Sequence, residues 1–264
     1  MAGVRLDKLL VERGVAETRS RAQALILAGR VLVDGAVLDK AGTAVAPDAE
    51  ITLLEVSPYV SRGGEKLEAA LEAFAPPLKG AVLADIGSST GGFTDCLLKS
   101  GAGKLYAVDV GRGVLDSTLR QDPRVVVLEG VNARYLTSAH IAEPLDGATV
   151  DVAFISLKLI LPALAPLMKE AAWVLALVKP QFEVGRGEVG KGGVVRDEAK
   201  HRRVLVEVAE AADSLGLKPQ GLMASPLKGP KGNREFFLYL EKGDSAGLPD
   251  FEGTVEAVVS SPAG

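Results

Sequence analysis

The chain has 264 residues, of which 47% are hydrophobic and 24% are charged, so it can bury a sizeable core as one large domain or as a small and a medium one. A net charge of −4 argues against indiscriminate coating of nucleic acid, and the single cysteine, Cys96, excludes an internal disulfide. The sequence shows no signal peptide, no run of roughly 18 apolar residues that could span a bilayer, and no cysteine and histidine cluster for zinc. We therefore expect a cytoplasmic protein without membrane-spanning segments or a metal site. The oligomeric state is left open.

The first 57 residues combine two short helices with a small sheet. The expected elements are helices over 6–13 and 21–28, a hairpin over 31–38 and a strand over 50–54. Ser20 followed by Gln23 is a capping-box pattern for the second helix, and the pair Asp34-Gly35 favours a tight primed turn in the hairpin. Six basic residues stand against three acidic ones between residues 1 and 30, which predicts a modest basic patch.

These elements resemble the alpha-L RNA-binding fold, which occurs in a small-subunit ribosomal protein, in pseudouridine synthases and in some aminoacyl-tRNA synthetases. The residues that carry the resemblance are 5–7, 18–22 and 29–35. The resemblance implies that RNA phosphates are contacted by Arg5, Arg19, Arg21 and Arg30. From the residues alone, an ordinary solvated helix face remains the alternative. We take residues 1–57 as this first domain.

Both periodicities break at residues 58–65, where a proline and paired glycines indicate a linker. A helix is expected over 66–74, and strands then alternate with helices, which predicts an α/β sheet. The expected strands are 81–86, 105–110, 125–129, 150–155, 173–178, 220–224 and 236–240. Only a loop joins the last two, which suits an antiparallel hairpin at the sheet edge. We therefore expect a second domain over 66–242 and a loosely ordered tail over 243–264.

The stretch 81–111 is the most informative part of the chain, because it is a strand, a glycine turn, a helix and a second strand that ends in Asp109. Glycines in the turn 87–92 let backbone N–H groups approach a ligand closely, a helix begins near Gly92, and Asp109 can accept hydrogen bonds from a ribose. The turn lacks the second glycine of a dinucleotide fingerprint. It therefore favours S-adenosyl-L-methionine, with another nucleotide, or a turn that merely connects two strands, as alternatives.

Four ionisable residues stand among apolar neighbours where strands or helices meet loops. Lys66 follows the linker, Asp151 starts an apolar strand, Lys179 closes another strand, and Glu235 opens the last one. Such surroundings are unusual for charges unless the charges pair or take part in chemistry. Each one alone is more often an ordinary strand-end charge, but together with the glycine turn they indicate an active site.

From about residue 5 to residue 241 the chain resembles the TlyA family of ribosomal-RNA 2′-O-methyltransferases, whose catalytic domain is of the FtsJ type. The motifs that carry the resemblance are 61–67, 87–94, 151–157, 179–183 and 232–235. The resemblance implies a Rossmann-like seven-stranded methyltransferase sheet behind the alpha-L domain, S-adenosyl-L-methionine as cofactor, and ribosomal RNA or ribosomal subunits as partner, with cytidine ribose as target. It also implies a catalytic tetrad of Lys66, Asp151, Lys179 and Glu235. The cofactor-binding residues that it implies are Asp85, Gly87, Ser88, Ser89, Thr90, Gly91, Gly92, Phe93, Asp109, Val110 and Asn132.

The chemistry requires such a set, because a ribose 2′-hydroxyl is a poor nucleophile that must meet the methyl group in line at about 3 Å. A lysine has an unperturbed pKa near 10.4, which is too high for a base at neutral pH, and burial or a second nearby cation would lower that pKa. We hypothesise that Lys179 orients or deprotonates the hydroxyl, and that Lys66 assists it and stabilises the developing oxyanion. Asp151 and Glu235 then hold the two ammonium groups in place.

Three other functions compete with this one. A non-catalytic RNA-binding protein would be expected to lack one or more tetrad positions, whereas all four are present. A membrane-active haemolysin, a name also given to this family, would need a spanning segment or a strongly basic amphipathic helix, and the sequence shows neither. A nicotinamide-dependent oxidoreductase would bind NAD rather than S-adenosyl-L-methionine, which calorimetric titration distinguishes.

Overall fold

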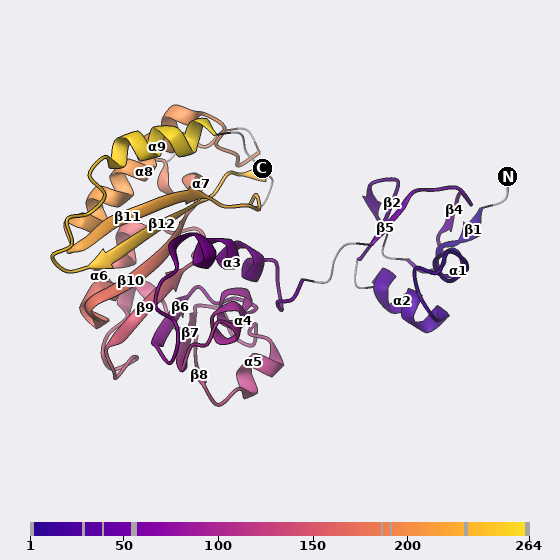
Figure 1. Ribbon diagram of the computed structural model, residues 1–264, viewed down its shortest axis with the longest axis horizontal. Helices are drawn as coiled ribbons and strands as arrows, with labels where there is room; N and C mark the ends of the chain where they lie inside the picture. Colours follow the sequence, from indigo (N-terminus) through magenta and orange to yellow (C-terminus); the bar gives the residue numbers. More distant parts are fainter. Residues whose placement is uncertain are drawn as a thin grey trace. The chain divides into compact units, whose positions relative to one another are not determined.

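The structure is a computed structural model that describes residues 3–27, 30–38, 40–53, 57–185, 187–190, 192–229 and 232–261. The chain divides into two compact units, Met1–Ser57 and Pro58–Gly264, which are described separately (Figure 1). The ends of two predicted elements, at residues 28 and 54, lie outside the described residues. Among the residues that are described, no helix combines the length and apolar character needed to cross a membrane.

The N-terminal unit packs two helices against short strands. Its helices are α1 (Leu6–Glu12) and α2 (Arg19–Leu27), its three-stranded sheet has the order β3 (Ala36–Val37), β2 (Val31–Val33), β5 (Ile51–Leu53), and β1 (Val4–Arg5) pairs with β4 (Ala44–Val45). Asp34 and Gly35 have φ angles of 51° and 78°, which is the left-handed conformation that the predicted primed turn requires. The predicted capping box is wrong: helix α2 begins two residues earlier, at Arg19, and the Thr18 hydroxyl accepts from the Arg21 N–H at 3.2 Å.

The second unit is built on one seven-stranded sheet with the order β11-β12-β10-β9-β6-β7-β8. The strands are β6 (Val82–Ile86), β7 (Lys104–Asp109), β8 (Val125–Glu129), β9 (Leu145–Val150), β10 (Met168–Val178), β11 (Leu217–Ala224) and β12 (Phe236–Lys242). Strands β8, β7, β6, β9 and β10 run parallel, whereas β12 runs antiparallel to both β10 and β11. The expected doubly wound methyltransferase sheet with a final reversal is therefore confirmed.

Helices cover both faces of this sheet (Figure 1). The helical segments are α3 (Gly63–Phe74), α4 (Gly92–Lys99), α5 (Ser117–Gln121), η1 (Ala133–Tyr135), η2 (Leu157–Leu159), α6 (Leu161–Leu164), η3 (Ala165–Leu167), α7 (Pro180–Glu183), α8 (Glu198–Asp213) and α9 (Phe251–Ser260). Alternate residues of β12 enter different cores: Phe236 packs in the cluster that includes α8 and α9 residues, and Phe237 packs in the cluster of α3 and α4. The two faces of β12 thus connect two separate layers.

One predicted strand, 150–155, is misplaced. Strand β9 ends at Val150, and the chain then leaves the sheet through Phe154, which has a φ of 63° and is 92% exposed. The true strand contains Gly147, where a Cβ would lie 2.3 Å from the Trp173 ring. Close packing against Trp173 therefore requires a glycine in this strand. Because the strand ends at Val150, Asp151 follows a strand instead of starting one.

Two further expectations fail for packing reasons. Part of the predicted linker is helical, because α3 begins at Gly63 and the missing side chain of Gly64 makes room for Tyr59, whose Cγ would lie 2.1 Å from a Cβ. The tail is not loosely ordered over Phe251–Ser260, since α9 buries Val255 and Val259 in the main core.

Candidate active site

The glycine turn after β6 is shaped by close contacts that exclude side chains. A Cβ on Gly87, whose φ is 87°, would lie 2.3 Å from the Asp151 carbonyl oxygen, and one on Gly92 would lie 2.3 Å from the Ser61 hydroxyl oxygen. The Ser89 N–H donates to an Asp109 carboxylate oxygen at 2.8 Å, and the Gly111 N–H donates to the other oxygen at 2.7 Å. The turn and the end of β7 therefore form one connected surface at the carboxyl edge of the sheet.

Two cavities, each of about 460 Å³, adjoin this turn. The first is lined by Ser61, Arg62, Gly63, Lys66, Gly87, Ser88, Ser89, Thr90, Gly92, Phe93, Asp151, Lys179, Lys228, Gly229 and Glu235. The second is lined by Gly87, Ser89, Val108, Asp109, Val110, Val131, Asn132, Ala133, Asp151, Val152, Ala153, Phe154, Ile155 and Ile160. Gly87, Ser89 and Asp151 belong to both, so they form the wall where the two cavities meet.

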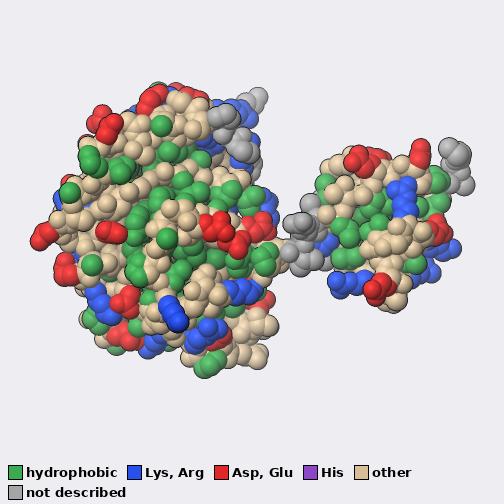
Figure 2. Space-filling view, in the orientation of Figure 1, with side chains coloured by type: hydrophobic (Ala, Val, Ile, Leu, Met, Phe, Trp, Pro, Cys, Tyr) green, Lys and Arg blue, Asp and Glu red, His purple; other side chains and the backbone are tan. Residues whose placement is uncertain are grey.

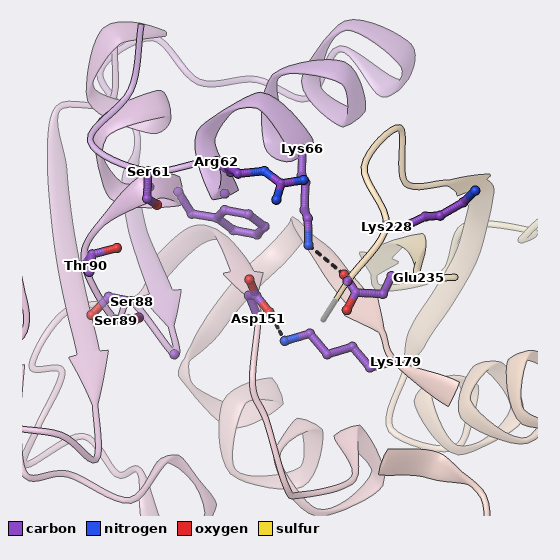
Figure 3. A pocket seen from close by; sticks show the side chains of 15 residues that line it. Ser61, Arg62, Lys66, Ser88, Ser89, Thr90, Asp151, Lys179, Lys228 and Glu235 are labelled. Carbon is purple, nitrogen blue, oxygen red and sulfur yellow. Dashed lines mark hydrogen bonds and ion pairs between the residues drawn. The ribbon is translucent and has the colours of Figure 1, made fainter. Parts of the chain in front are cut away.

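The first cavity brings the four predicted catalytic residues together as two ion pairs (Figure 3). The Lys66 ammonium lies 2.7 Å from a Glu235 carboxylate oxygen, and the Lys179 ammonium pairs with Asp151. Lys66 comes from the first turn of α3, Asp151 follows β9, Lys179 follows β10, and Glu235 precedes β12. The side chain of Glu235 is fully buried and those of Lys66 and Lys179 are 12% and 13% exposed, which fits charges that are held by partners.

Glu235 has an unusual environment for a buried carboxylate. Its Oε2 atom accepts from Lys66, whereas Oε1 has no hydrogen-bond partner among the described residues. Gly229 backs the carboxylate so closely that a Cβ there would lie 1.9 Å from Oε1. Among the described residues, the ion pair with Lys66 is thus the one polar interaction of the Glu235 side chain.

The second cavity has the features that an adenosine requires. Asp109 presents a carboxylate at the end of β7, and the Asn132 side chain is fixed because its oxygen accepts from the Arg134 N–H at 3.0 Å. Val131, Val152 and Ile155 supply apolar wall on which a base can lie. The donor set, the apolar wall and the glycine cradle together fit S-adenosyl-L-methionine.

Two of the predicted cofactor residues do not line either cavity. Asp85 is fully buried beneath the turn, where its carboxylate accepts from the Thr94 hydroxyl at 2.7 Å and from the Thr149 hydroxyl at 3.0 Å. This burial raises the pKa of Asp85 to about 7. Gly91 faces Leu115 and Leu119, because it precedes α4 in a left-handed conformation with a φ of 96°. Both positions shape the turn from behind.

Several residues at the site were not predicted from the sequence. Arg62 and Lys228 place exposed cationic side chains on the first cavity, and Ser61 lies beside the turn (Figure 3). Phe154 lies on the second cavity, with its ring centroid 5.0 Å from that of Phe182. Arg62 and Phe154 lie within the motifs 61–67 and 151–157 that carry the family resemblance, but exposure at a cavity rim is not visible in a sequence.

In the N-terminal unit, one buried carboxylate organises two of the four predicted RNA-binding arginines. Asp7 accepts from Arg5 at 3.0 and 2.9 Å, from Arg19 at 2.9 Å and from Gln23 at 2.9 Å. These hydrogen bonds hold the pKa of the Asp7 carboxyl well below its usual range. Arg21 is exposed on α2, and Arg30 is half-buried before β2. Figure 2 shows Lys and Arg side chains on the visible face and at the edges of this unit.

The seven-stranded sheet with its antiparallel β12, together with a glycine turn that joins two cavities, defines a Rossmann-like methyltransferase. Residues 59–242 match the model of the FtsJ-like methyltransferase family, and residues 4–51 match that of the S4 domain.

Named relatives narrow this class further. The 16S/23S rRNA (cytidine-2′-O)-methyltransferase TlyA of Mycobacterium tuberculosis is 49% identical over 238 residues, which cover 89% of this chain and 89% of that protein. Hemolysin A of Brachyspira hyodysenteriae is 39% identical over 237 residues, or 89% of this chain and 99% of that one. A solved structure from Streptococcus thermophilus that carries a hemolysin name is 42% identical, with a TM-score of 0.76, and covers 98% of this chain and 96% of its own. The chain belongs to the TlyA family of FtsJ-like methyltransferases, whose cofactor is S-adenosyl-L-methionine.

Proposed function

We propose that this chain methylates the 2′-hydroxyl of a cytidine in ribosomal RNA with S-adenosyl-L-methionine as donor. The observation that carries the proposal is the first cavity, in which two carboxylate-paired lysines lie beside the turn that adjoins the cofactor-type cavity. The choice of cytidine and of ribosomal RNA rests on the named function of the Mycobacterium tuberculosis relative. A ribosomal substrate also implies a cytoplasmic location.

The residues of the chain divide the work between donor and acceptor. S-adenosyl-L-methionine supplies, when bound, a methyl group activated by its sulfonium charge. The residues that would surround its methionyl end are Gly87, Ser88, Ser89, Thr90, Gly92 and Phe93, and those for its adenosine are Asp109, Val110 and Asn132. Asp85 and Gly91 support the turn from behind.

The ribose is received in the first cavity by the two lysines. Lys179 is paired with Asp151, and Asp151 forms part of the wall between the cavities, so Lys179 is the ammonium or amine placed to orient or deprotonate a hydroxyl there. Lys66 opposes it from α3 and stabilises negative charge on the ribose oxygen. Asp151 and Glu235 keep both lysine side chains in fixed positions. The ribose hydroxyl is thereby held in line with the methyl group, and such orientation can supply much of the rate acceleration.

The S4-type unit supplies the sequence-independent part of RNA binding. Arg5 and Arg19 retain N–H groups beyond those given to Asp7, and their side chains remain 46% and 51% exposed. Together with Arg21 and Arg30 they would contact phosphates of ribosomal RNA or of an assembled subunit.

The test is methyl transfer from tritiated S-adenosyl-L-methionine to ribosomal subunits and to protein-free ribosomal RNA, followed by mapping of 2′-O-methyl marks. Lys179→Ala should abolish transfer and leave cofactor binding by calorimetry nearly intact. Lys169→Ala is the matched control, because Lys169 is an exposed lysine that pairs with Asp146 and lines neither cavity. Equal activity of Lys179→Ala and Lys169→Ala would remove Lys179 from the mechanism.

A further inference from the structure

The C-terminal helix α9 lies beyond residues 59–242, which match the FtsJ-like family, yet it is an integral part of the second unit. It packs on α8 and β11, and Val255 and Val259 are buried in the same core as Phe236 of β12 (Figure 1). Arg202 of α8 ties the two helices together through Glu256 and the Ser260 hydroxyl. The position of α9 is therefore well defined by packing and by polar contacts.

Arg234 joins this helix to the active-site strand. Its guanidinium donates to the carbonyl oxygens of Val259 at 2.7 Å, Val258 at 3.2 Å and Ser261 at 3.1 Å. These carbonyls lie at the C-terminal end of α9, where an arginine both satisfies unpaired acceptors and complements the helix dipole. Its guanidinium carbon also lies 5.3 Å from the centre of the Phe236 ring. Four contacts thus fix this one side chain.

The neighbouring residue is Glu235, and the two side chains leave the chain on opposite sides. Arg234 shares its side with Phe236, which belongs to the core that contains α9, whereas Glu235 reaches Lys66 on α3. Side chains alternate in this way in extended backbone, so a rotation that released Arg234 would also turn Glu235. Asn233 secures the preceding position, because its side chain accepts from the Val195 N–H and donates to the Gly193 carbonyl, each at 3.0 Å.

Glu235 needs such support because, among the described residues, just one of its carboxylate oxygens has a hydrogen-bond partner. A single bond to a flexible lysine does not set the direction of a carboxylate. We propose that Arg234 is a positioning residue that anchors the carboxylate of Glu235 to the C-terminal end of α9. This inference rests on the proposed function.

The test compares Arg234→Met with Arg202→Met in the full-length protein. Both changes remove a guanidinium that binds α9 and keep an apolar stem. The described polar partners of Arg202 are Glu198, Glu256 and Ser260, none of which belongs to the segment 232–235. Arg234→Met should lower kcat for methyl transfer about tenfold or more and leave KM for RNA and the Kd of S-adenosyl-L-methionine within about twofold. Arg202→Met should leave kcat within about twofold, although both variants lower Tm. Arg234→Lys should restore part of kcat.

A second readout does not depend on methyl transfer. Acetic anhydride labelling, resolved by peptide mass spectrometry, should modify Lys66 faster in Arg234→Met than in the unchanged protein, with Lys179 as internal reference. If the unchanged protein transfers no methyl group, the proposed function fails, and the labelling still decides the role of Arg234. Unchanged Lys66 labelling, or a kcat equal to that of Arg202→Met, would show that Arg234 only stabilises the fold and would overturn the proposal.

Discussion

Replacing the buried Asp7 with asparagine tests whether its negative charge or its hold on two arginines matters more for RNA binding. The two effects change the affinity for RNA in opposite directions. Asp7→Asn removes one negative charge from a unit that binds phosphates, so simple electrostatics predicts tighter binding: about 0.5 kcal/mol for a phosphate about 8 Å away in water, or roughly twofold. The structure predicts the reverse, because Asp7 fixes Arg5 and Arg19 with three of its four hydrogen bonds.

The size of the expected loss follows from those contacts. An asparagine offers the arginines one oxygen instead of two and turns an amide donor toward them, so at least one arginine loses its fixed position. Ordering a free arginine side chain on RNA costs about 2 kcal/mol of rotamer entropy, which corresponds to roughly 30-fold weaker binding. We therefore expect the dissociation constant for a ribosomal RNA fragment to rise by about 10- to 30-fold.

The assay is fluorescence anisotropy of a labelled RNA fragment at several salt concentrations, below the melting temperature of each variant. Asp48→Asn is the matched control, because it removes the same charge from an exposed carboxylate of the same unit. In a background that carries Arg5→Gln and Arg19→Gln, Asp7→Asn should have no further effect, whereas a general loss of folding would still weaken binding. Binding by Asp7→Asn as tight as that by Asp48→Asn would refute the reasoning.

Three further outcomes concern the second unit. Gly64→Ala should destabilise the protein by about 1–3 kcal/mol in urea unfolding, since a Cβ would lie 2.1 Å from Tyr59 Cγ; an unchanged midpoint would mean that Tyr59 moves freely. Burial lowers the pKa of His201, so the unfolded chain binds the proton first and stability should fall as the pH drops below about 6.5; His201→Gln should flatten this part of the pH profile. Burial raises the pKa of Asp85 to about 7, so stability should fall by up to roughly 1.4 kcal/mol per pH unit as the pH rises from about 4 to 7. Asp85→Asn should remove that slope, and an unaltered slope would contradict the assignment to Asp85.

The candidate catalytic centre could be proposed from the sequence because its residues lie in short motifs with local signals. Lys66, Asp151, Lys179 and Glu235 each stood as a charge in apolar surroundings, and the structure brings all four to one cavity. The glycines of the turn likewise indicated a place where other backbone approaches closely, because no larger residue fits there. Such signals survive in a sequence because each depends on one residue type at one position.

What the sequence did not disclose depends on partners that are distant along the chain. The strand at 145–150 looked less apolar than the segment after it, because Gly147 and Thr149 are selected by the Trp173 ring and the Asp85 carboxylate. The valine side chains of helix α9 stabilise it only because they pack on α8 and β11, and a sequence does not show that contact. The pairing of Arg5 and Arg19 with Asp7 is similarly invisible until the N-terminal unit has folded.

The wall formed by Gly87, Ser89 and Asp151 has a kinetic meaning. In the proposed function, the adenosine of the donor lies in the second cavity and the acceptor ribose in the first, so that both substrates can be bound at once and no methylated enzyme has to carry the group between them. Initial-velocity plots should therefore show intersecting lines instead of the parallel lines of a ping-pong scheme.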